Sequence, residues 1–460
     1  MTSAPDSLPK TSIKPSIVPT PRASWREAWA VYLQPRVLIV LLLGFSSGLP
    51  LALSGSTLLV WMRESGVDLR TIGLFALVGT PYTLKFLWAP LVDALHVPVF
   101  TRAFGRRRGW LVFAQMLLIC AILLLALTDP VRSPLFVAIG ALLVATMSAT
   151  QDIVVDAFRV ESLPESEQAA GMASYVAAYR IGMLVSTAGV LFLVSAFEDT
   201  GIGRSSAWTW GYVAMAAMVL IGTVTALAAT EPGQSARAEA ATRGEAAFSR
   251  VMHAAMGAFS EFLVRKHAWA ALAFVVLYKL TDAFSGVMTA PFVIDLGFTR
   301  NDYATIVKGV GLAATLVGGF AGGYMARRYS LAASLWIGGL LQALSNLAFC
   351  WLAFVGVNQW ALAVAITAEN FTGAIGTVIF VAYLSALCQN PLHTATQYAL
   401  LTALAAVGRT YLSAGSGYVA EATGWPMFFV ISVVVAVPSL ILLAWLQRRG
   451  HFDELGPVRV

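Results

Sequence analysis

The chain carries twelve apolar stretches, each long enough to cross a lipid bilayer as a helix. A transmembrane helix needs about 20 predominantly apolar residues, whereas transmembrane β-strands are about ten residues long and alternate in polarity. The sequence therefore predicts an all-α integral membrane protein with twelve transmembrane helices. The stretches lie at residues 36–62, 71–94, 110–128, 134–157, 169–197, 208–230, 267–293, 303–326, 331–356, 360–388, 395–420 and 425–447.

Composition excludes the other broad classes of protein. The chain is 58% hydrophobic and 12% charged, whereas a soluble domain is about 45–50% apolar and about 25% charged. These values exclude a soluble enzyme and a disordered chain. The three cysteines, Cys120, Cys350 and Cys388, each lie within an apolar run, which is typical of small buried side chains and not of a disulfide framework.

The basic residues predict how the spans are oriented. If the N-terminus is inside, 20 of the 30 Lys and Arg residues fall in inner segments, five in outer loops and five within spans. Because Lys and Arg are enriched in cytoplasmic loops, both termini are predicted to be cytoplasmic. The net charge of +6 then reflects membrane topology and is no evidence for binding to nucleic acid.

The longest internal connection, residues 231–266, divides the spans into two six-helix halves, 36–230 and 267–447. We interpret it as a cytoplasmic linker that ends either in an amphipathic helix on the inner membrane surface or in an extension of the seventh span. Residues 1–35 are rich in Pro, Ser and Thr, which predicts a disordered N-terminal tail. Residues 448–460 are predicted to form a short cytoplasmic tail.

The two halves carry matching arginines within the bilayer. In the fifth span Gln168 precedes Arg180 by twelve residues, and in the eleventh span Gln397 precedes Arg409 by the same interval. This pattern favours an internal repeat over chance similarity between Ala- and Gly-rich helices. An ionised group at a helix centre costs about 2.5–3.5 kcal/mol on insertion scales, and a guanidinium binds carboxylates in bidentate fashion. Arg180 and Arg409 are therefore predicted to bind an anionic substrate, unless nearby carbonyls or acids satisfy them.

Two acids on the fourth span are candidates for proton coupling and gating. Asp152 and Asp156 lie four residues apart on one helix face, and Gln151 adjoins them. A carboxylate in a partly dry site can exchange a proton near neutral pH, so Asp152 with Gln151 is the leading candidate for proton coupling. Asp156 lies nearer the end of the span and is predicted to act in a gate, paired with Arg159 or with Arg106–Arg108.

Other charges within the spans have two interpretations each. Asp282 is a further proton-coupling candidate, unless Lys279, three residues earlier, neutralises it. Glu369 is predicted to belong to the substrate site, as a second titrating group or as the partner of the eleventh-span arginine. Lys85 either contributes to the substrate site or extends toward the inner surface, and surface extension is the expectation for Lys308.

Three tyrosines lie close in sequence to these charges. Tyr82 precedes Lys85, Tyr179 precedes Arg180, and Tyr411 follows Arg409. An aromatic ring beside a polar group suits a sugar ring or an amide plane, so we include all three in the predicted substrate site. The alternative is packing against neighbouring helices or a place in an interfacial aromatic belt.

Five segments carry a family resemblance. They are Gly44-Phe-Ser-Ser-Gly-Leu-Pro50, Lys85-Phe-Leu-Trp-Ala-Pro-Leu-Val-Asp93, Gly105-Arg-Arg-Arg-Gly-Trp110, Gln151-Asp-Ile-Val-Val-Asp-Ala157 and Tyr179-Arg-Ile-Gly-Met183. Together they resemble the AmpG-type anhydromuropeptide permeases of bacterial inner membranes, a family of the major facilitator superfamily (MFS). The resemblance implies an MFS fold and proton-driven import of GlcNAc-1,6-anhydroMurNAc-peptides from periplasm to cytoplasm. Such import serves peptidoglycan recycling and can feed β-lactamase induction, hence β-lactam resistance.

The resemblance also places a gate between the second and third spans, formed by Asp93 with Arg106, Arg107 and Arg108. Here the superfamily signature is stretched, because twelve residues separate Asp93 from Arg106. This spacing argues against direct contact between Asp93 and these arginines. The Gln151–Asp152 pair is where the resemblance places proton-linked function.

Several chemistries have no sequence support. The chain contains no GxxxxGK[ST] sequence, no HExxH sequence and no cysteine pair with metal-ligand spacing, so no enzyme activity, metal or cofactor is expected. The expected partners are an anhydromuropeptide, protons and the lipid bilayer, with the protein acting as a monomer. Two alternatives stay open, an MFS carrier for another large anion such as acetyl-CoA or a siderophore, and a non-transporting membrane receptor.

Overall fold

The computed structural model describes residues 30–232, 266–388 and 394–455. Residues 1–29 of the predicted N-terminal tail and the predicted linker helix therefore lie outside the described residues. Every regular element in the described part of the chain is helical, which confirms the prediction of an all-α protein.

Among the described residues, ten segments are long and apolar enough to cross a membrane, judged by length and composition. In the first half they are built from α2 (Pro35–Leu53) with α3 (Ser56–Glu64), α8 (Arg106–Ala126), α9 (Pro134–Ser162), α10 (Glu165–Leu184) with α11 (Val190–Asp199), and α12 (Arg204–Ala228). In the second half they are built from α15 (Ala268–Tyr278) with α16 (Leu280–Asp295), α17 (Arg300–Asp302) with α18 (Gly311–Arg328), α19 (Leu331–Val355), α20 (Gln359–Leu387), and α23 (Trp425–Val434) with α24 (Val437–Arg448).

The second and eleventh predicted spans are broken into short helices. They comprise α4 (Leu69–Leu74), α5 (Thr80–Leu84) and α6 (Ala89–Ala94) in one case, and α21 (Thr394–Val407) and α22 (Ser416–Thr423) in the other. Pro81 and Pro90 lie in the first turns of α5 and α6, where a missing N–H is tolerated although the preceding helix cannot continue through it. Helix α4 packs against α22, and α5 packs against α21. The broken spans thus lie side by side and join the two halves.

Asp68 caps the first of these short helices. Its carboxylate accepts a hydrogen bond from the backbone N–H of Thr71 at 2.9 Å. This bond holds the pKa of the Asp68 carboxyl below its ordinary value, because hydrogen bonding to the charged form favours it. The cap satisfies an N–H that the short helix leaves without an internal partner.

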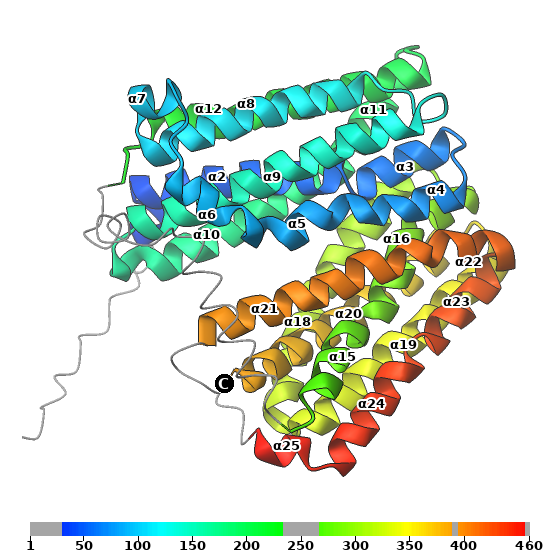
Figure 1. Ribbon diagram of the computed structural model, residues 1–460. Coiled ribbons are helices and arrows are strands. Elements are labelled where there is room, and N and C mark those ends of the chain that lie inside the picture. Colours follow the sequence, from blue (N-terminus) through cyan, green and yellow to red (C-terminus); the bar gives the residue numbers. More distant parts are fainter. Residues whose placement is uncertain (1–29, 233–265, 389–393, 456–460) are drawn as a thin grey trace, which may run out of the picture.

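The order of the spans places both described chain ends at one end of the molecule. We call this the proximal end; it holds Pro35 and Arg448. The opposite, distal end holds Glu64 and Asp295. Figure 1 shows two helical bundles that meet at the distal end, on the right of the view. That the proximal end is cytoplasmic remains a prediction from the basic residues.

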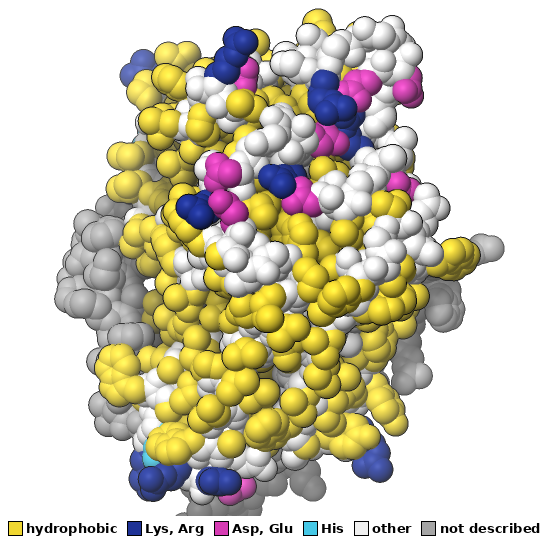
Figure 2. Space-filling model, turned by 90° about the vertical axis from the view of Figure 1, so that its right-hand side faces the viewer, with side chains coloured by type: hydrophobic (Ala, Val, Ile, Leu, Met, Phe, Trp, Pro, Cys, Tyr) yellow, Lys and Arg dark blue, Asp and Glu magenta, His cyan; other side chains and the backbone are white. Residues whose placement is uncertain are grey.

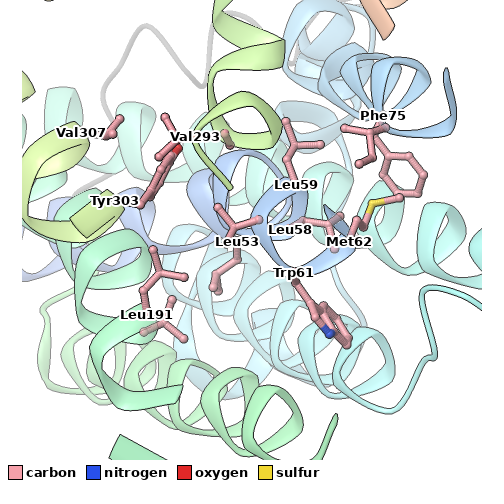
Figure 3. Close-up of a cluster of buried hydrophobic side chains, with 14 of the residues drawn as sticks. Leu53, Leu58, Leu59, Trp61, Met62, Phe75, Leu191, Val293, Tyr303 and Val307 are labelled. Atoms are coloured by element: carbon pink, nitrogen blue, oxygen red, sulfur yellow. The ribbon is translucent and has the colours of Figure 1, made fainter. Parts of the chain in front are cut away.

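One buried hydrophobic cluster crosses between the halves. It combines Leu53, Leu59 and Leu191 of the first half with Val293 and Tyr303 of the second, and Figure 3 shows these side chains gathered around α3. The two smaller clusters lie toward the proximal end, and each stays within one half. The halves are therefore packed together at the distal end and have separate cores at the proximal end.

The outer surface is largely hydrophobic. Figure 2, in which the right-hand side of Figure 1 faces the viewer, shows a broad hydrophobic area between charged side chains in the upper half of the view and a few Lys and Arg side chains at the lower edge. Large exposed side chains include Phe320, Phe354 and Trp360. A soluble monomer rarely exposes so extensive an apolar surface, and contact with lipid accounts for it.

Candidate substrate site

Arg409 lines a cavity of about 410 Å³ between the two halves. Tyr82 and Phe75 give this cavity an aromatic wall. The Oγ1 atoms of Thr83 and Thr410 lie 3.4 Å apart across the boundary between the halves. We call this cavity the hydroxyl chamber, because five hydroxyl side chains besides the tyrosine line it: Ser54, Ser56, Thr83, Thr410 and Ser413.

Arg180 lines two further cavities, of about 290 and 370 Å³. Both also contain Glu369 and Asn370 in their walls, so the two cavities adjoin one another. Lys308 lines the smaller cavity and Asp282 the larger. We call the two together the charged chamber, because its walls carry charges of both signs.

The two chambers adjoin one another. Ser56, Leu59 and Gly286 line both the hydroxyl chamber and the smaller cavity of the charged chamber. A Cβ atom on Gly286 would meet nothing within 4 Å, so there is open space at this junction. The predicted midplane arginines therefore line neighbouring parts of one polar region.

Close helix crossings place Arg180. Helix α10 crosses α2 where a Cβ on Gly44 would lie 2.6 Å from the carbonyl oxygen of Tyr175, and a Cβ on Gly48 would overlap that of Tyr179. Only glycine allows two backbones to approach so closely. The crossing fixes the height and rotation of α10, which leaves Arg180 exposed in the chamber.

Arg409 is placed by a similar contact in the second half. It lies in the π-helical turn η6 (Gly408–Leu412), and a Cβ on Gly408 would lie 2.7 Å from the carbonyl oxygen of Val276 in α15. Within the described residues neither Arg409 nor Arg180 takes part in an ion pair. Both guanidinium groups are therefore available to an anionic ligand.

The acids of the charged chamber differ in their partners. Asp282 Oδ2 lies 2.6 Å from Lys279 Nζ, so Lys279 neutralises Asp282, as their spacing suggested. Glu369 accepts a hydrogen bond from Asn370 Nδ2 at 2.6 Å and has no ion-pair partner among the residues that the structure describes. Glu369 shares a chamber with the fifth-span arginine, and the alternative pairing with Arg409 does not occur.

Asp152 lies outside the walls of both chambers. It is 7% exposed, and its Oδ2 lies 3.9 Å from Lys85 Nζ. Lys85 thus turns toward this acid, whereas the sequence suggested the substrate site or the inner surface. Gln151 is fully buried and donates to Ser47 Oγ at 3.3 Å. The structure groups these four residues as one polar cluster at the contact of α9 with α2, in which Lys85 alone is partly exposed.

Comparison with known proteins assigns the family. The model of the Major Facilitator Superfamily matches residues 37–411. The anhydromuropeptide permease of Escherichia coli (strain K12) is 41% identical over 427 residues, which cover 93% of this chain and 82% of that protein. A Rickettsia felis relative with AmpG in its name is 34% identical over 417 residues, covering 90% of this chain and 97% of that one.

The chain belongs to the AmpG-type permeases of the major facilitator superfamily. The crystal structure of the nucleoside transporter NupG covers 92% of this permease and 100% of its own chain, at 12% identity and a TM-score of 0.65. That of a D-xylose–proton symporter covers 89% and 97%, at 14% identity and a TM-score of 0.64. These two likenesses bear on the fold alone, and they confirm the predicted MFS fold. The permease is a multi-pass protein of the bacterial inner membrane and a transporter, not an enzyme.

The basic residues predicted to form a gate lie at the proximal end of the permease. Arg107 donates to Glu161 at 2.5 Å and 2.9 Å, and Arg106 lies 3.7 Å from the same carboxylate. Arg108 donates to the carbonyl oxygens of two residues at the end of α12. The backbone N–H groups of Arg107 and Arg108 donate to Glu231. The acids that hold this segment are thus ones that the sequence did not single out.

The other two gate candidates have different outcomes. Asp156 lies 3.7 Å from Arg159, one of the pairings that the sequence offered. The Asp93 side chain lies outside what the structure describes.

Of the three predicted tyrosines, Tyr82 lines the hydroxyl chamber. Tyr179 packs beside Tyr175 with ring centroids 5.9 Å apart, and Tyr411 is 40% exposed but lines neither chamber.

Lys308 is a chamber residue that sequence reasoning missed. Its Nζ donates to Ser56 Oγ at 3.2 Å and lies 5.4 Å from the centre of the Tyr303 ring. A lysine near the outer end of a span looks the same in sequence whether it extends to the surface or turns inward. Helix η5 (Tyr303–Val310), a π-helical segment, turns Lys308 inward, and sequence patterns gave no signal for it.

Sequence reasoning also missed three ion pairs that join the halves at the distal end. Arg300 donates to Glu64 at 2.6 Å and to Glu198 at 3.0 Å. Arg63 donates to Asp295, in one of its two bonds at 2.7 Å. In the sequence the two arginines counted only among the basic residues of the outer loops, and the three acids were not singled out. We call these three ion pairs together the distal latch.

Two acids of the distal latch, Glu64 and Asp295, each accept a hydrogen bond from a tryptophan of their own half. Trp208 Nε1 donates to Glu64 Oε2 at 3.2 Å, and Trp425 Nε1 donates to Asp295 Oδ2 at 3.2 Å. The acids end the first spans of their halves, and the tryptophans lie at the start of the last spans. The latch therefore follows the approximate symmetry of the two halves.

Proposed function

We propose that this permease imports anhydromuropeptides, GlcNAc-1,6-anhydroMurNAc-peptides, from periplasm to cytoplasm together with protons. The 41% identity to the E. coli anhydromuropeptide permease supports this substrate class. The observation that carries the proposal is that Arg180 and Arg409 are exposed in adjoining chambers and have no ion pair within the described residues. Two unpaired guanidinium groups suit a ligand whose peptide bears several carboxylates.

The direction of transport follows from the predicted orientation. The halves are packed together at the distal end, where the distal latch lies. If the distal end is periplasmic, this structure corresponds to the state of an importer that releases its cargo into the cytoplasm. Loading from the periplasm then requires the distal latch to open and the proximal ends to close.

Proton coupling has two structural candidates. The Asp152–Lys85 cluster lies beside the crossing of α9 with α2, and Glu369 lines the charged chamber. In each case, protonation of the acid would change its contacts with side chains of neighbouring helices. We expect Asp152→Asn to retain ligand binding and to lose the dependence of uptake on a pH gradient.

The test is uptake of a labelled GlcNAc-1,6-anhydroMurNAc-tripeptide into proteoliposomes. We expect accumulation when the donor side is acid, and collapse of accumulation with a protonophore. Equal uptake with and without the gradient would contradict proton coupling and would indicate facilitated transport instead. Absence of uptake, together with absence of binding by the purified protein, would contradict the substrate assignment. Acetyl-CoA serves as the competing anion in the same assay.

A further inference from the structure

We propose that the adjoining chambers divide the substrate, so that the hydroxyl chamber takes the neutral anhydrodisaccharide and the charged chamber takes the stem peptide, with Glu369 binding its free amine. This inference rests on the proposed function. It adds which end of the ligand each chamber recognises and names a residue that discriminates between peptides.

The hydroxyl chamber has the chemistry of a sugar site. Its walls carry a single ionisable side chain of permanent charge, Arg409, among hydroxyls and apolar groups. Serine and threonine hydroxyls both donate and accept hydrogen bonds, as sugar hydroxyls do. Tyr82 and Phe75 add flat apolar surface, and the guanidinium can donate to acetamido and ring-hydroxyl oxygens without requiring an anion.

The charged chamber has the chemistry of a site for a zwitterion. Arg180 and Lys308 are available to carboxylates, since neither is in an ion pair with a described residue. Of its two acids, Asp282 is already neutralised by Lys279 at 2.6 Å. Within the part of the chain that the structure describes, Glu369 is held only by the neutral amide of Asn370. The acid left to bind an ammonium group is therefore Glu369.

The junction allows one ligand to reach both chambers. Ser56, Leu59 and Gly286 belong to both walls, and the space above Gly286 is open. A muropeptide has this layout, because its sugars carry no charge while its peptide carries carboxylates. When the third residue of the stem is a diamino acid, the peptide also carries an ammonium group. The opposite placement would put the charges of the peptide against hydroxyls and a single cation.

The test compares two ligands and two variants by calorimetric titration of the full-length protein in lipid nanodiscs. One ligand is the disaccharide tripeptide with a free side-chain amine, and the other is the same molecule with that amine acetylated. For the wild type we expect acetylation to weaken binding by about tenfold or more, the loss of one charge-assisted hydrogen bond. In Glu369→Gln we expect this ratio to fall to within about twofold of one.

The matched control is Thr83→Val, an isosteric change in the hydroxyl chamber. It is expected to weaken both ligands alike and so to keep the wild-type ratio. Glu369→Asp, which retains the charge on a shorter side chain, is expected to give an intermediate ratio. A ratio that is unchanged in Glu369→Gln, or that collapses in Thr83→Val, would overturn the assignment. If the wild type binds neither ligand, the proposed function fails instead.

Discussion

Arg180 and Arg409 are guanidinium groups within a membrane protein, exposed to a polar cavity and without an ionic partner among the described residues. Placing an ionised group within a membrane costs free energy. A role in binding a carboxylate explains why these arginines are present. We expect Arg180→Ala to lower the affinity for the muropeptide by about tenfold or more, as for other hydrogen bonds to charged groups. Arg180→Lys should retain only part of the wild-type affinity, because an ammonium group cannot bind a carboxylate in bidentate fashion.

The same measurement on Arg409 tests whether both arginines contact the ligand. Arg409→Ala is expected to reduce binding while the amount of protein in the membrane stays at the wild-type level. Arg132, which is exposed at the distal end, provides a control substitution outside the chambers. Wild-type affinity in either alanine variant would show that the arginine concerned is not part of the site.

The Lys85–Asp152 pair gives a second prediction. Asp152 is buried, so removal of Lys85 leaves a carboxylate without its counter-charge. Because the side chain of Lys85 is 36% exposed, we expect Lys85→Ala to destabilise the protein by only on the order of 1 kcal/mol. Adding Asp152→Asn to the Lys85→Ala variant should restore most of the lost stability. Thermal unfolding of the two single variants and the double variant measures this coupling.

Sequence alone located these charged residues because charges within apolar stretches are rare. It could not pair them. Lys85 and Asp152 belong to different spans, and their contact depends on how the helices pack. Lys308 was misread for the same reason, since the π-helical segment that turns it inward leaves no signature in residue types. Lys279 and Asp282 were paired correctly because three residues on one helix suffice to bring them together.

Glycines set the helix crossings on which the site depends. A Cβ on Gly48 would overlap the carbonyl oxygen of Tyr179, the residue before Arg180. We expect Gly48→Ala to destabilise the protein by about 1–3 kcal/mol, as overpacking does in other tight interfaces, and to weaken ligand binding because α10 shifts. Gly323→Ala is the matched control, since a Cβ there meets nothing within 4 Å. Equal stability of the two variants would contradict this account of the crossing.

Hydropathy predicted where the spans lie, and it located the broken ones as well. It could not predict that they are broken, because a proline or glycine within a span is compatible with a kinked but continuous helix. Pro81 and Pro90 lie at the start of short helices here. What decides the outcome is the packing of α4 against α22 and of α5 against α21, between segments more than 300 residues apart.

The distal latch makes a prediction about the balance between conformations. Arg300 and Glu64 have side chains that are 7% and 11% exposed, so Arg300→Gln leaves a nearly buried carboxylate without its partner. We expect the ratio of distal-open to distal-closed protein to rise by about tenfold or more. Spin labels at positions 132 and 357, in distal loops of opposite halves, would report this as a longer distance, once the three native cysteines are replaced.

Arg70 provides the control for that experiment. It lies 3.2 Å from Glu421 and also joins the halves at the distal end, but both side chains are well exposed, at 54% and 37%. Exposed ion pairs contribute little, so Arg70→Gln should leave the distance distribution as in the wild type. A similar shift in both variants would mean that burial of the distal latch is not what holds the halves together.

The contact of Gly73 with Gly417 bears on leakage. A Cβ on Gly73 would lie 2.7 Å from the backbone nitrogen of Gly417, so main chain touches main chain between α4 and α22. No side chain at this contact can change rotamer and so open a path for water or ions. Water or ions can pass between α4 and α22 only if the two helices move apart as rigid bodies. Until then the protein adds no ion leak to the membrane at this contact.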